Sequence, residues 1–269
     1  MAFFVDVHTH LTHSDFDSDR ADVIARAKLA GLGAIVVNGL EPSSNRIILK
    51  MAEMDPVIRP ALGIYPLDAV CEKIPSDFPF EVPVFDIAAE ISFIRAQAAQ
   101  GRLAAIGECG LDGHYLGPEF LPGQEKVFEA LIGIAMEFAI PIIIHSRKCE
   151  KRVGEILAAH GTKLANFHCF GGRANMAKEF AEKFGWLFSI PANCVVNEGF
   201  QKMLKILPPE VILTETDAPY LGPVRGQRNE PANVVGTVSL LAKYRGWTES
   251  DAKSRVFENY KRLFGVVSK

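Results

Sequence analysis

The sequence predicts an α/β fold, a (β/α)₈ TIM barrel formed by one domain that spans residues 1–269. Short apolar runs alternate with segments of helical periodicity along the whole chain, which is typical of parallel strands joined by right-handed crossovers. The length of 269 residues is close to the usual size of such a barrel. Histidines and acids follow several of the apolar runs, where the carboxyl ends of barrel strands would meet.

Eight short runs rich in β-branched and aromatic residues are expected to be strands. They lie at residues 3–7, 34–37, 57–64, 104–107, 140–144, 164–167, 186–190 and 211–216. A doubly wound open sheet would leave the polar residues after the first and last runs harder to bring together. A closed barrel places all of them at one end, so the barrel is favoured.

Helices are expected between successive strands, and two more should close the chain. The expected helices lie at residues 18–30, 43–53, 85–100, 124–138, 150–159, 174–184, 199–206, 232–244 and 249–264. The segment 124–138 is the clearest, because Val127, Leu131 and Phe138 fall on one side of a helix. A loop punctuated by prolines is expected between Pro75 and Pro83.

The composition indicates an ordinary globular protein, with 48% hydrophobic and 23% charged residues. The formal net charge of −3 excludes the strongly basic surface that wraps duplex nucleic acid, so any contact with nucleic acid should be local, at an end or a short single strand. Five scattered cysteines without a C-x-x-C pair suggest reduced thiols. No signal peptide or membrane-spanning segment is expected, which favours a cytoplasmic location.

The histidines give the strongest functional signal. His8 and His10 are two residues apart at the end of the first strand, so both side chains leave the same face and can bind one divalent ion. An isolated H-x-H pair could equally be hydrogen-bonded and structural. Four of the seven histidines, however, follow predicted strands, which favours a metal site.

Further candidate ligands follow the fourth, fifth, sixth and eighth strands. They are Glu108, His145, His168 and Asp217. A carboxylate can bridge two cations, so six ligands with one bridge suit a two-metal hydrolase, in which the ions lie roughly 3.5–4 Å apart. Each ligand set would be incomplete and would leave positions for water and substrate.

Two dications and two carboxylates would leave a surplus charge of about +2, which favours an anionic substrate such as a phosphate. Arginines in the loops after the same strands can bind phosphate through two hydrogen bonds at once. Arg147, Arg173 and Arg228 are the candidate substrate contacts, and Lys148 and Arg225 lie nearby in the same loops.

Several motifs together resemble one known family. The segments are Asp6-Val7-His8-Thr9-His10-Leu11, Gly107-Glu108-Cys109-Gly110-Leu111-Asp112, Ile144-His145-Ser146-Arg147, His168-Cys169-Phe170, Glu215-Thr216-Asp217-Ala218-Pro219-Tyr220-Leu221 and Arg228-Asn229-Glu230-Pro231-Ala232. They occur in the order found in the TatD family and cover nearly the whole chain.

The resemblance implies a TIM-barrel, metal-dependent hydrolase, and many family members are deoxyribonucleases that act as 3′→5′ exonucleases. By the family pattern, His8, His10, Glu108 and Asp217 would hold one metal ion, and Glu108, His145 and His168 would hold the other. The chain departs from the pattern at Tyr65, where the family usually has histidine before the proline. It departs again at Gly113-His114, where the family often has an aromatic residue. Both departures lie where substrate should dock.

The expected chemistry is attack on phosphorus by a water activated by two metal ions. Asp217 and Glu108 are the candidate catalytic residues, with Asp217 also accepting the proton of the water. Glu215 either orients a ligand or is a structural inward-facing acid, and strand alternation should turn Cys109 and Cys169 away from the site. The residues leave open whether the two cations are Zn²⁺, Mn²⁺ or Mg²⁺.

The expected substrates are DNA ends or short single-stranded nucleic acid. The alternatives are an amidohydrolase-like enzyme that cleaves a C–N or ester bond, including the ester of an aminoacyl-tRNA, and a barrel kept as a binding protein. Many amidohydrolase sites use a carbamylated lysine at the fourth strand, where this chain has Glu108. A barrel that had lost activity should lack ligands, and all six are present.

Overall fold

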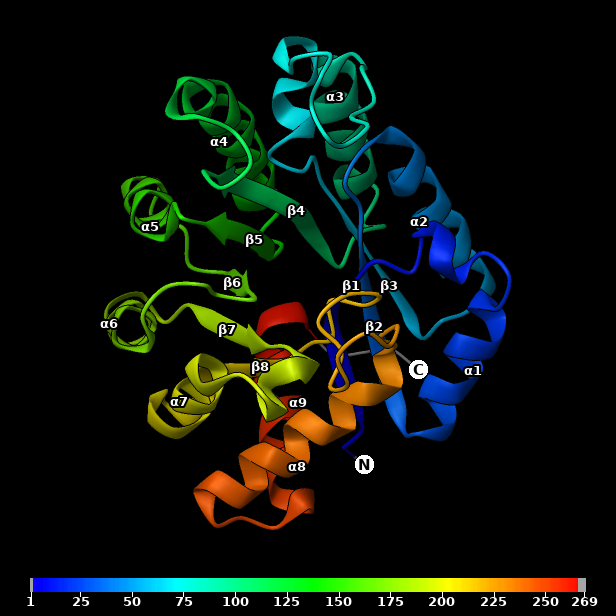
Figure 1. The fold of residues 1–269 in the computed structure, drawn as a ribbon, viewed down its shortest axis with the longest axis vertical. Coiled ribbons are helices and arrows are strands. Elements are labelled where there is room, and N and C mark those ends of the chain that lie inside the picture. The colour runs from blue at the N-terminus through cyan, green and yellow to red at the C-terminus, as the bar shows by residue number, and fades with distance from the viewer. Residues whose placement is uncertain (1, 266–269) are drawn as a thin grey trace.

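The computed structural model describes residues 2–265, in which helices surround an eight-stranded parallel sheet (Figure 1). Each strand pairs with the next one along the chain, in the order β1 to β8. The strands are β1 (Phe4–Thr9), β2 (Leu32–Asn38), β3 (Ile58–Leu62), β4 (Ala105–Asp112), β5 (Ile142–Arg147), β6 (Ala165–His168), β7 (Leu187–Ile190) and β8 (Ile212–Thr214). The predicted TIM barrel is thus confirmed.

The helices form a ring outside the strands (Figure 1). They are α1 (Arg20–Leu29), α2 (Pro42–Met54), α3 (Ile87–Ala99), α4 (Leu121–Glu137), α5 (Glu150–Ala159), α6 (Ala174–Phe184), α7 (Glu198–Ile206), α8 (Val234–Arg245) and α9 (Glu249–Phe264). Capping residues define several of their ends. The Thr248 hydroxyl accepts a hydrogen bond from the Asp251 backbone N–H at the start of α9, and Gly185 ends α6 in the left-handed conformation.

Hydrogen bonds join the end of the first strand to the segment after the last strand and bring the two edges of the sheet together. The Asp217 N–H donates to the His8 carbonyl, and the His10 N–H donates to the Ala218 carbonyl. One step deeper, the Asp6 carboxylate accepts hydrogen bonds from the backbone N–H and the hydroxyl of Thr216. These bonds hold the segment after β8 against the end of β1.

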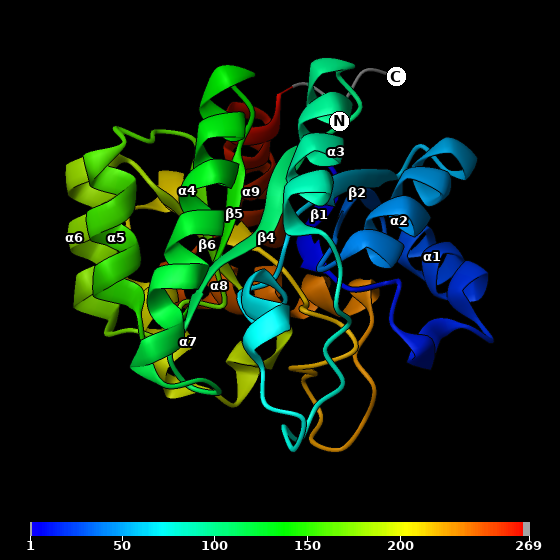
Figure 2. The ribbon, with the colours of Figure 1, turned by 90° about the horizontal axis from the view of Figure 1, so that it is seen from above.

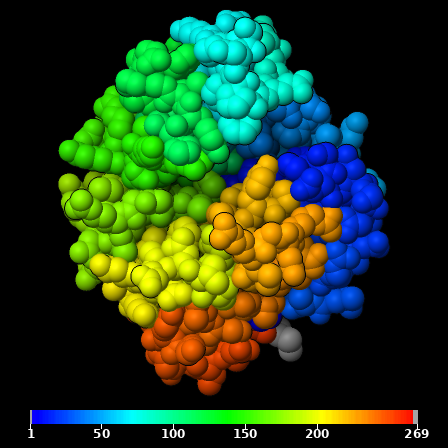
Figure 3. Space-filling model, in the orientation of Figure 1, coloured from blue at the N-terminus to red at the C-terminus, as the bar shows by residue number. Residues whose placement is uncertain are grey.

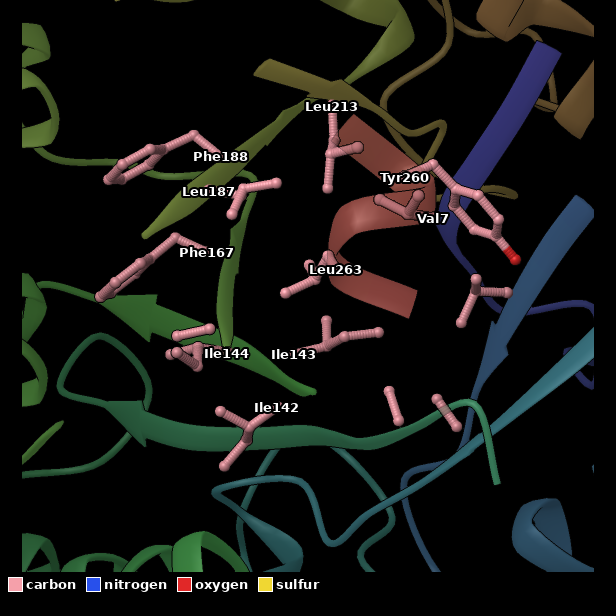
Figure 4. Packing of buried hydrophobic residues seen from close by; sticks show 14 of the residues in the cluster. Val7, Ile142, Ile143, Ile144, Phe167, Leu187, Phe188, Leu213, Tyr260 and Leu263 are labelled. Carbon is pink, nitrogen blue, oxygen red and sulfur yellow. The ribbon is translucent and has the colours of Figure 1, made fainter. Parts of the chain in front are cut away.

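The core fills the barrel and the layer between the strands and the helices. The strands carry apolar residues on both faces, as expected for a parallel sheet that is covered on its outer side. Figure 4 shows Ile142, Ile143 and Ile144 of β5 close to Phe167 of β6 and Leu187 of β7. This packing fixes the strands whose ends carry the candidate ligands.

The last helix covers the end of the barrel where the strands begin. Tyr260 and Leu263 of α9 are buried, and Figure 4 shows both among the apolar side chains of the strands. The Asn259 amide donates to the carbonyls of Pro209 and Ile212, just before and at the start of β8. Because α9 occupies this end, the opposite end carries the open mouth.

Two long connections border that mouth. One follows β3, covers residues 63–86 and includes the 3₁₀ segment Asp68–Lys73. The other follows β8, covers residues 215–233 and ends in the 3₁₀ turn Pro231–Asn233. Figure 2 shows both on the side of the molecule away from α9, and Figure 3 shows a hollow beside the orange segment that follows β8.

The strand boundaries differ from the sequence-based ranges at their carboxyl ends. The fourth strand was expected to stop at Gly107, but β4 continues to Asp112 because it stays paired with β5, Gly110 opposite His145 and Asp112 opposite Arg147. Backbone pairing therefore continues beyond the first polar side chain. In the described part of the chain, no helix has both the length and the apolar character needed to cross a bilayer.

Candidate metal centre

Six side chains gather at the carboxyl end of the barrel, within the mouth. They come from β1 and the residue after it, from β4, β5 and β6, and from the segment after β8: His8, His10, Glu108, His145, His168 and Asp217. Five of them are buried residues, and the Asp217 side chain is 14% exposed. The structure thus brings together every side chain that the sequence proposed as a metal ligand.

The first group of donor atoms has the spacing of a tetrahedral metal site. The Nε2 atoms of His8 and His10 are 3.2 Å apart, and Oε2 of Glu108 lies 3.4 Å from each. Oδ1 of Asp217 lies 3.6 Å from the His8 nitrogen and 3.3 Å from the His10 nitrogen. Around a tetrahedral Zn²⁺ with bonds of about 2.0–2.1 Å, ligand atoms lie about 3.3–3.4 Å apart. The donors of His8, His10 and Glu108 therefore fit one divalent cation, and the Asp217 oxygen lies close to both imidazoles.

The second group shares Glu108 with the first. Oε1 of Glu108 lies 2.8 Å from Nδ1 of His145 and 2.8 Å from Nε2 of His168, and these nitrogens are 3.4 Å apart. The 2.8 Å separations are hydrogen-bond distances, shorter than the spacing around zinc. Two imidazoles and a carboxylate are a suitable but incomplete set for a second divalent cation, with room for water or substrate.

Glu108 is placed between the two groups by close backbone packing. Its Oε2 faces the β1 histidines and its Oε1 faces the histidines of β5 and β6. At Gly63, just past β3, a Cβ atom would lie 2.3 Å from the Glu108 carbonyl oxygen. At Gly110, which has φ +145°, it would lie 2.0 Å from the His145 carbonyl oxygen. Only glycine lets these backbones approach so closely.

Polar groups behind the ligands orient two of the imidazoles. Nδ1 of His10 donates to the Asn38 carbonyl at 3.2 Å, which leaves the lone pair on Nε2, toward the first group. Oδ2 of Asp112 accepts from Nε2 of His145 at 2.9 Å, so the other nitrogen of this ring faces Glu108. Such contacts fix both the tautomer and the position of a ligand.

The electrostatics keep the carboxylates ionised. Burial alone would raise the pKa of Glu108, but the adjacent histidines hold it well below its usual range. Burial also opposes ionisation of Asp217, and the hydrogen bond and charge of His10 outweigh it and lower the pKa. Burial and the charge of His168 lower the pKa of His8 to about 4, which keeps this imidazole neutral and able to donate a lone pair.

The pKa of His145 is shifted in the opposite direction. Burial would lower its pKa, but hydrogen bonds to Asp112 and Glu108 outweigh that effect and raise the pKa to about 9. Without a cation, the ring therefore carries a proton between two carboxylates. A metal ion that binds Nδ1 must displace this proton.

The two acids that follow β8 have distinct positions. Asp217 has a left-handed backbone with φ +57°, which is accessible to aspartate and turns the chain at the mouth. Glu215 is fully buried, and it accepts hydrogen bonds from the Cys169 N–H at 2.7 Å and the Ser189 hydroxyl at 2.5 Å. Its Oε1 lies 3.9 Å from Nδ1 of His168. Glu215 thus links the ends of β6, β7 and β8 behind the ligands.

The candidate substrate arginines differ in their surroundings. Arg147 is exposed at the end of β5, and Arg173 is exposed at the residue before α6. Arg228 forms two hydrogen bonds with Asp19, at 2.8 and 2.7 Å, and lies over the Phe16 ring. The structure therefore places Arg147 beside the ligand strand β5 and pairs Arg228 with an acid near the start of α1.

The thiols next to the ligands are protonated. Cys109 is buried, and its sulfur contacts the Ile143 carbonyl at 3.8 Å, away from the donors. Strand alternation does not apply to Cys169, because this residue follows β6 and has φ +43°. Burial and the Glu215 carboxyl raise the pKa of the Cys169 thiol well above its usual range.

Sequence reasoning missed Asp112 and Asn38 as ligand partners. Asp112 could have been found once β4 was extended, because residues 108, 110 and 112 share one face of a strand. Asn38 could not have been found in this way, because its contribution is a backbone carbonyl. The position of that carbonyl depends on the pairing of β2 with β1.

The sequence matches the TatD related DNase family over residues 5–265. It is 31% identical to the putative deoxyribonuclease TATDN3 of Mus musculus, over 97% of this chain and 87% of that protein. It is also 31% identical to the 3′-5′ ssDNA/RNA exonuclease TatD of Escherichia fergusonii, over 97% of this chain and 98% of that protein.

Solved structures share the fold. That of YJJV, a TatD homologue from Escherichia coli K12, superposes with a TM-score of 0.84 and 24% identity, covering 98% of both chains. The phosphotriesterase homology protein from Escherichia coli gives a TM-score of 0.69 at 15% identity, over 98% of this chain and 99% of that one. Because the family match extends over nearly all of the sequence, this chain belongs to the TatD-related DNase family.

Proposed function

We propose that this protein is a metal-dependent phosphodiesterase that removes nucleotides from the ends of DNA or short single strands, using two divalent cations. The observation that carries the proposal is that six donor side chains meet at one end of the barrel, with Glu108 shared by two groups and Asp217 beside His8 and His10. Relatives that are 31% identical carry the names deoxyribonuclease and 3′-5′ ssDNA/RNA exonuclease, which supports nucleic acid as the substrate.

Two groups of side chains would hold the cations. His8, His10, Glu108 and Asp217 would hold one cation, and Glu108, His145 and His168 the other. When bound, the cations would supply Lewis-acid activation of a water molecule and of a phosphoryl oxygen. Zn²⁺ and Mn²⁺ suit the imidazole-rich set, and Mg²⁺ is the third candidate.

Asp217 would accept the proton of the attacking water. Its pKa is lowered by His10, so it is ionised at neutral pH, and its side chain is the most exposed of the acids in the two donor groups. Arg147 would contact a phosphate, since it is exposed next to the ligand strand β5. Arg173 would be a second phosphate contact, and Arg228 would mainly hold the segment after β8 against Asp19.

The substitution Glu108→Ala tests the proposal. Loss of the shared carboxylate should reduce hydrolysis of end-labelled single-stranded DNA by more than about 100-fold, since even the partners behind metal ligands are worth about 10- to 100-fold. Glu182→Ala, at an exposed acid of α6, is the matched control. Activity of pure Glu108→Ala protein at the wild-type level would refute the proposed site.

The same assays distinguish a nuclease from an amidohydrolase-like enzyme. A product ladder that shortens from the 3′ end, lost in chelator and restored by Mn²⁺, Mg²⁺ or Zn²⁺, is the expected result. Turnover of aminoacyl-tRNA, amides or lactones without cleavage of DNA would instead identify an amidohydrolase-like enzyme. The carboxylate of Glu108 at the position of the carbamylated lysine favours the nuclease.

A further inference from the structure

We propose that Tyr115, together with Phe80 and Arg147, forms a platform on which an unpaired base of the substrate stacks next to the cleaved phosphate. We call these three side chains the aromatic ledge. The inference rests on the proposed function, because it concerns how the same site holds a nucleic acid. It assigns base recognition to residues outside the metal ligands.

The ledge is assembled from three separate segments at the mouth. The Phe80 and Tyr115 rings meet edge to face, with centroids 5.1 Å apart. The guanidinium carbon of Arg147 lies 4.9 Å from the centre of the Tyr115 ring. Phe80 belongs to the connection after β3, Tyr115 follows β4 and Arg147 ends β5. Three planar groups are thus brought together at one place.

The ledge keeps aromatic surface in contact with solvent. Phe80 is 49% exposed and Tyr115 is 38% exposed. Leu67, Val70 and Leu116 form a small buried cluster apart from the main core. Phe80 and Tyr115 are not part of this cluster and remain partly open to solvent. Exposed aromatic surface beside a polar site is typical of a binding surface.

Hydrogen bonds connect the ledge rigidly to the metal centre. Oδ1 of Asp112 accepts from the backbone N–H groups of His114 and Tyr115, at 2.7 and 3.0 Å, while its Oδ2 holds His145. The Gly113 N–H donates to the Arg147 carbonyl at 2.9 Å. One carboxylate therefore fixes both a metal ligand and the backbone of Tyr115. A base on the ledge would sit at a defined place relative to the cations.

Tyr65, just after β3, packs against a ligand histidine of β5. Its ring meets the His145 ring edge to face, with centroids 4.9 Å apart. Tyr65 also packs against the small cluster of Leu67, Val70 and Leu116, and Leu116 follows Tyr115 in the sequence.

The chemistry of the aromatic ledge suits a nucleotide with an unpaired base better than it suits a small anion. Every base has a planar face that can stack on a tyrosine or phenylalanine ring or on a guanidinium plane. Arg147 can also offer its charge to the adjacent phosphate. In a duplex the base faces are covered by their neighbours, so the ledge favours single-stranded ends. A simple phosphate ester would gain nothing from the rings.

The test compares oligonucleotides with and without a base. Single strands with phosphorothioate linkages, which resist cleavage, carry an abasic residue at each of the terminal three positions in turn. Affinity for the metal-loaded protein is measured by fluorescence anisotropy. Because stacking on an aromatic side chain is worth about fivefold or more in affinity, removal of one base should weaken binding to the wild-type protein by at least that factor.

Two variants at position 115 distinguish the effect of the planar ring from the effect of apolar volume. Tyr115→Phe keeps the ring and should keep the fivefold dependence on the base. Tyr115→Leu keeps apolar bulk without a planar ring, and it should bind intact and abasic strands within about twofold of each other. Equal binding of intact and abasic strands by the wild-type protein, or undiminished discrimination by Tyr115→Leu, would overturn the ledge.

A parallel measurement of cleavage distinguishes this inference from the proposed function. Ordinary phosphodiester strands are incubated with the same wild-type protein. Cleavage without any dependence of binding on the base would refute the ledge alone. Base-dependent binding without cleavage under any of the three metals would refute the nuclease function and leave the ledge as a binding surface.

Discussion

At the scale of single residues, one carboxylate organises much of the site. Asp112 holds His145 with one oxygen and two backbone N–H groups with the other. The hydrogen bond from His145 and those backbone groups outweigh burial and lower the pKa of Asp112. His145 therefore lies between two ionised acids, and its pKa of about 9 follows from that position.

Metal binding should depend on pH through His145. Because a cation competes with the proton on this imidazole, affinity for Mn²⁺ should rise by up to about tenfold per pH unit between pH 6.5 and 8.5, and level off near the raised pKa of about 9. Titration calorimetry in buffers of different ionisation enthalpy measures both the affinity and the protons released.

The variant Asp112→Asn provides the control for this prediction. It removes one of the two negative charges that hold the proton on His145, so the dependence of affinity on pH should become shallower. Affinity at the plateau should fall by about 10- to 100-fold, as for other partners of metal-bound histidines. Equal affinity of the wild-type protein at pH 6.5 and 8.5 would contradict the assignment.

The sequence predicted which six side chains meet and offered Glu215 as an orienting residue, but it did not predict Asp112 or the Asn38 carbonyl as partners. The ligand types and their order along the chain are visible in the motifs, for example in His8-Thr9-His10. The pairing of Arg228 with Asp19 depends on residues 209 positions apart, so local patterns could not reveal it. The roles of Arg147 and Arg173 stay predictions.

At the scale of elements, the strand ends position the chemistry. The alternation of strands and helices was predictable because strand and helix periodicities differ. The carboxyl ends of the strands were less predictable, because the sequence interpretation ended the fourth and fifth strands just before Glu108 and His145. In β4 and β5 the pairing continues through Glu108 and His145, since these side chains find partners inside the barrel.

Close packing of β3 against β4 can be tested with one methyl group. In Gly63→Ala, the added Cβ would lie 2.3 Å from the Glu108 carbonyl oxygen, so the backbone must shift. We expect the free energy of unfolding in urea to fall by about 1–3 kcal/mol. Hydrolysis should fall as well, because Glu108 moves.

Gly133→Ala is the matched control for that substitution. Gly133 lies within α4, and a Cβ atom there would have no neighbour within 4 Å. Alanine is the better helix former, so this variant should be more stable by about 0.5–1 kcal/mol. A Gly63→Ala protein as stable as the wild type would show that the close approach of the two strands is not needed.

At the scale of the whole molecule, the two ends of the barrel have different roles. Helix α9 covers the end where the strands begin, and its Tyr260 and Leu263 complete the core. The connections after β3 and β8 border the other end, where the donors lie (Figure 2). The overall architecture was predictable from the order of elements, whereas the shape of these long connections depends on contacts such as that between Phe80 and Tyr115.

In the proposed site, Glu108 joins two cations held by four imidazoles and two carboxylates. Anomalous diffraction from crystals grown with Mn²⁺ locates such ions, because each bound ion gives its own peak. Two peaks roughly 3.5–4 Å apart, on either side of the Glu108 carboxylate, are expected. Absence of any peak among these six side chains, or a single peak bound elsewhere, would contradict the proposed site.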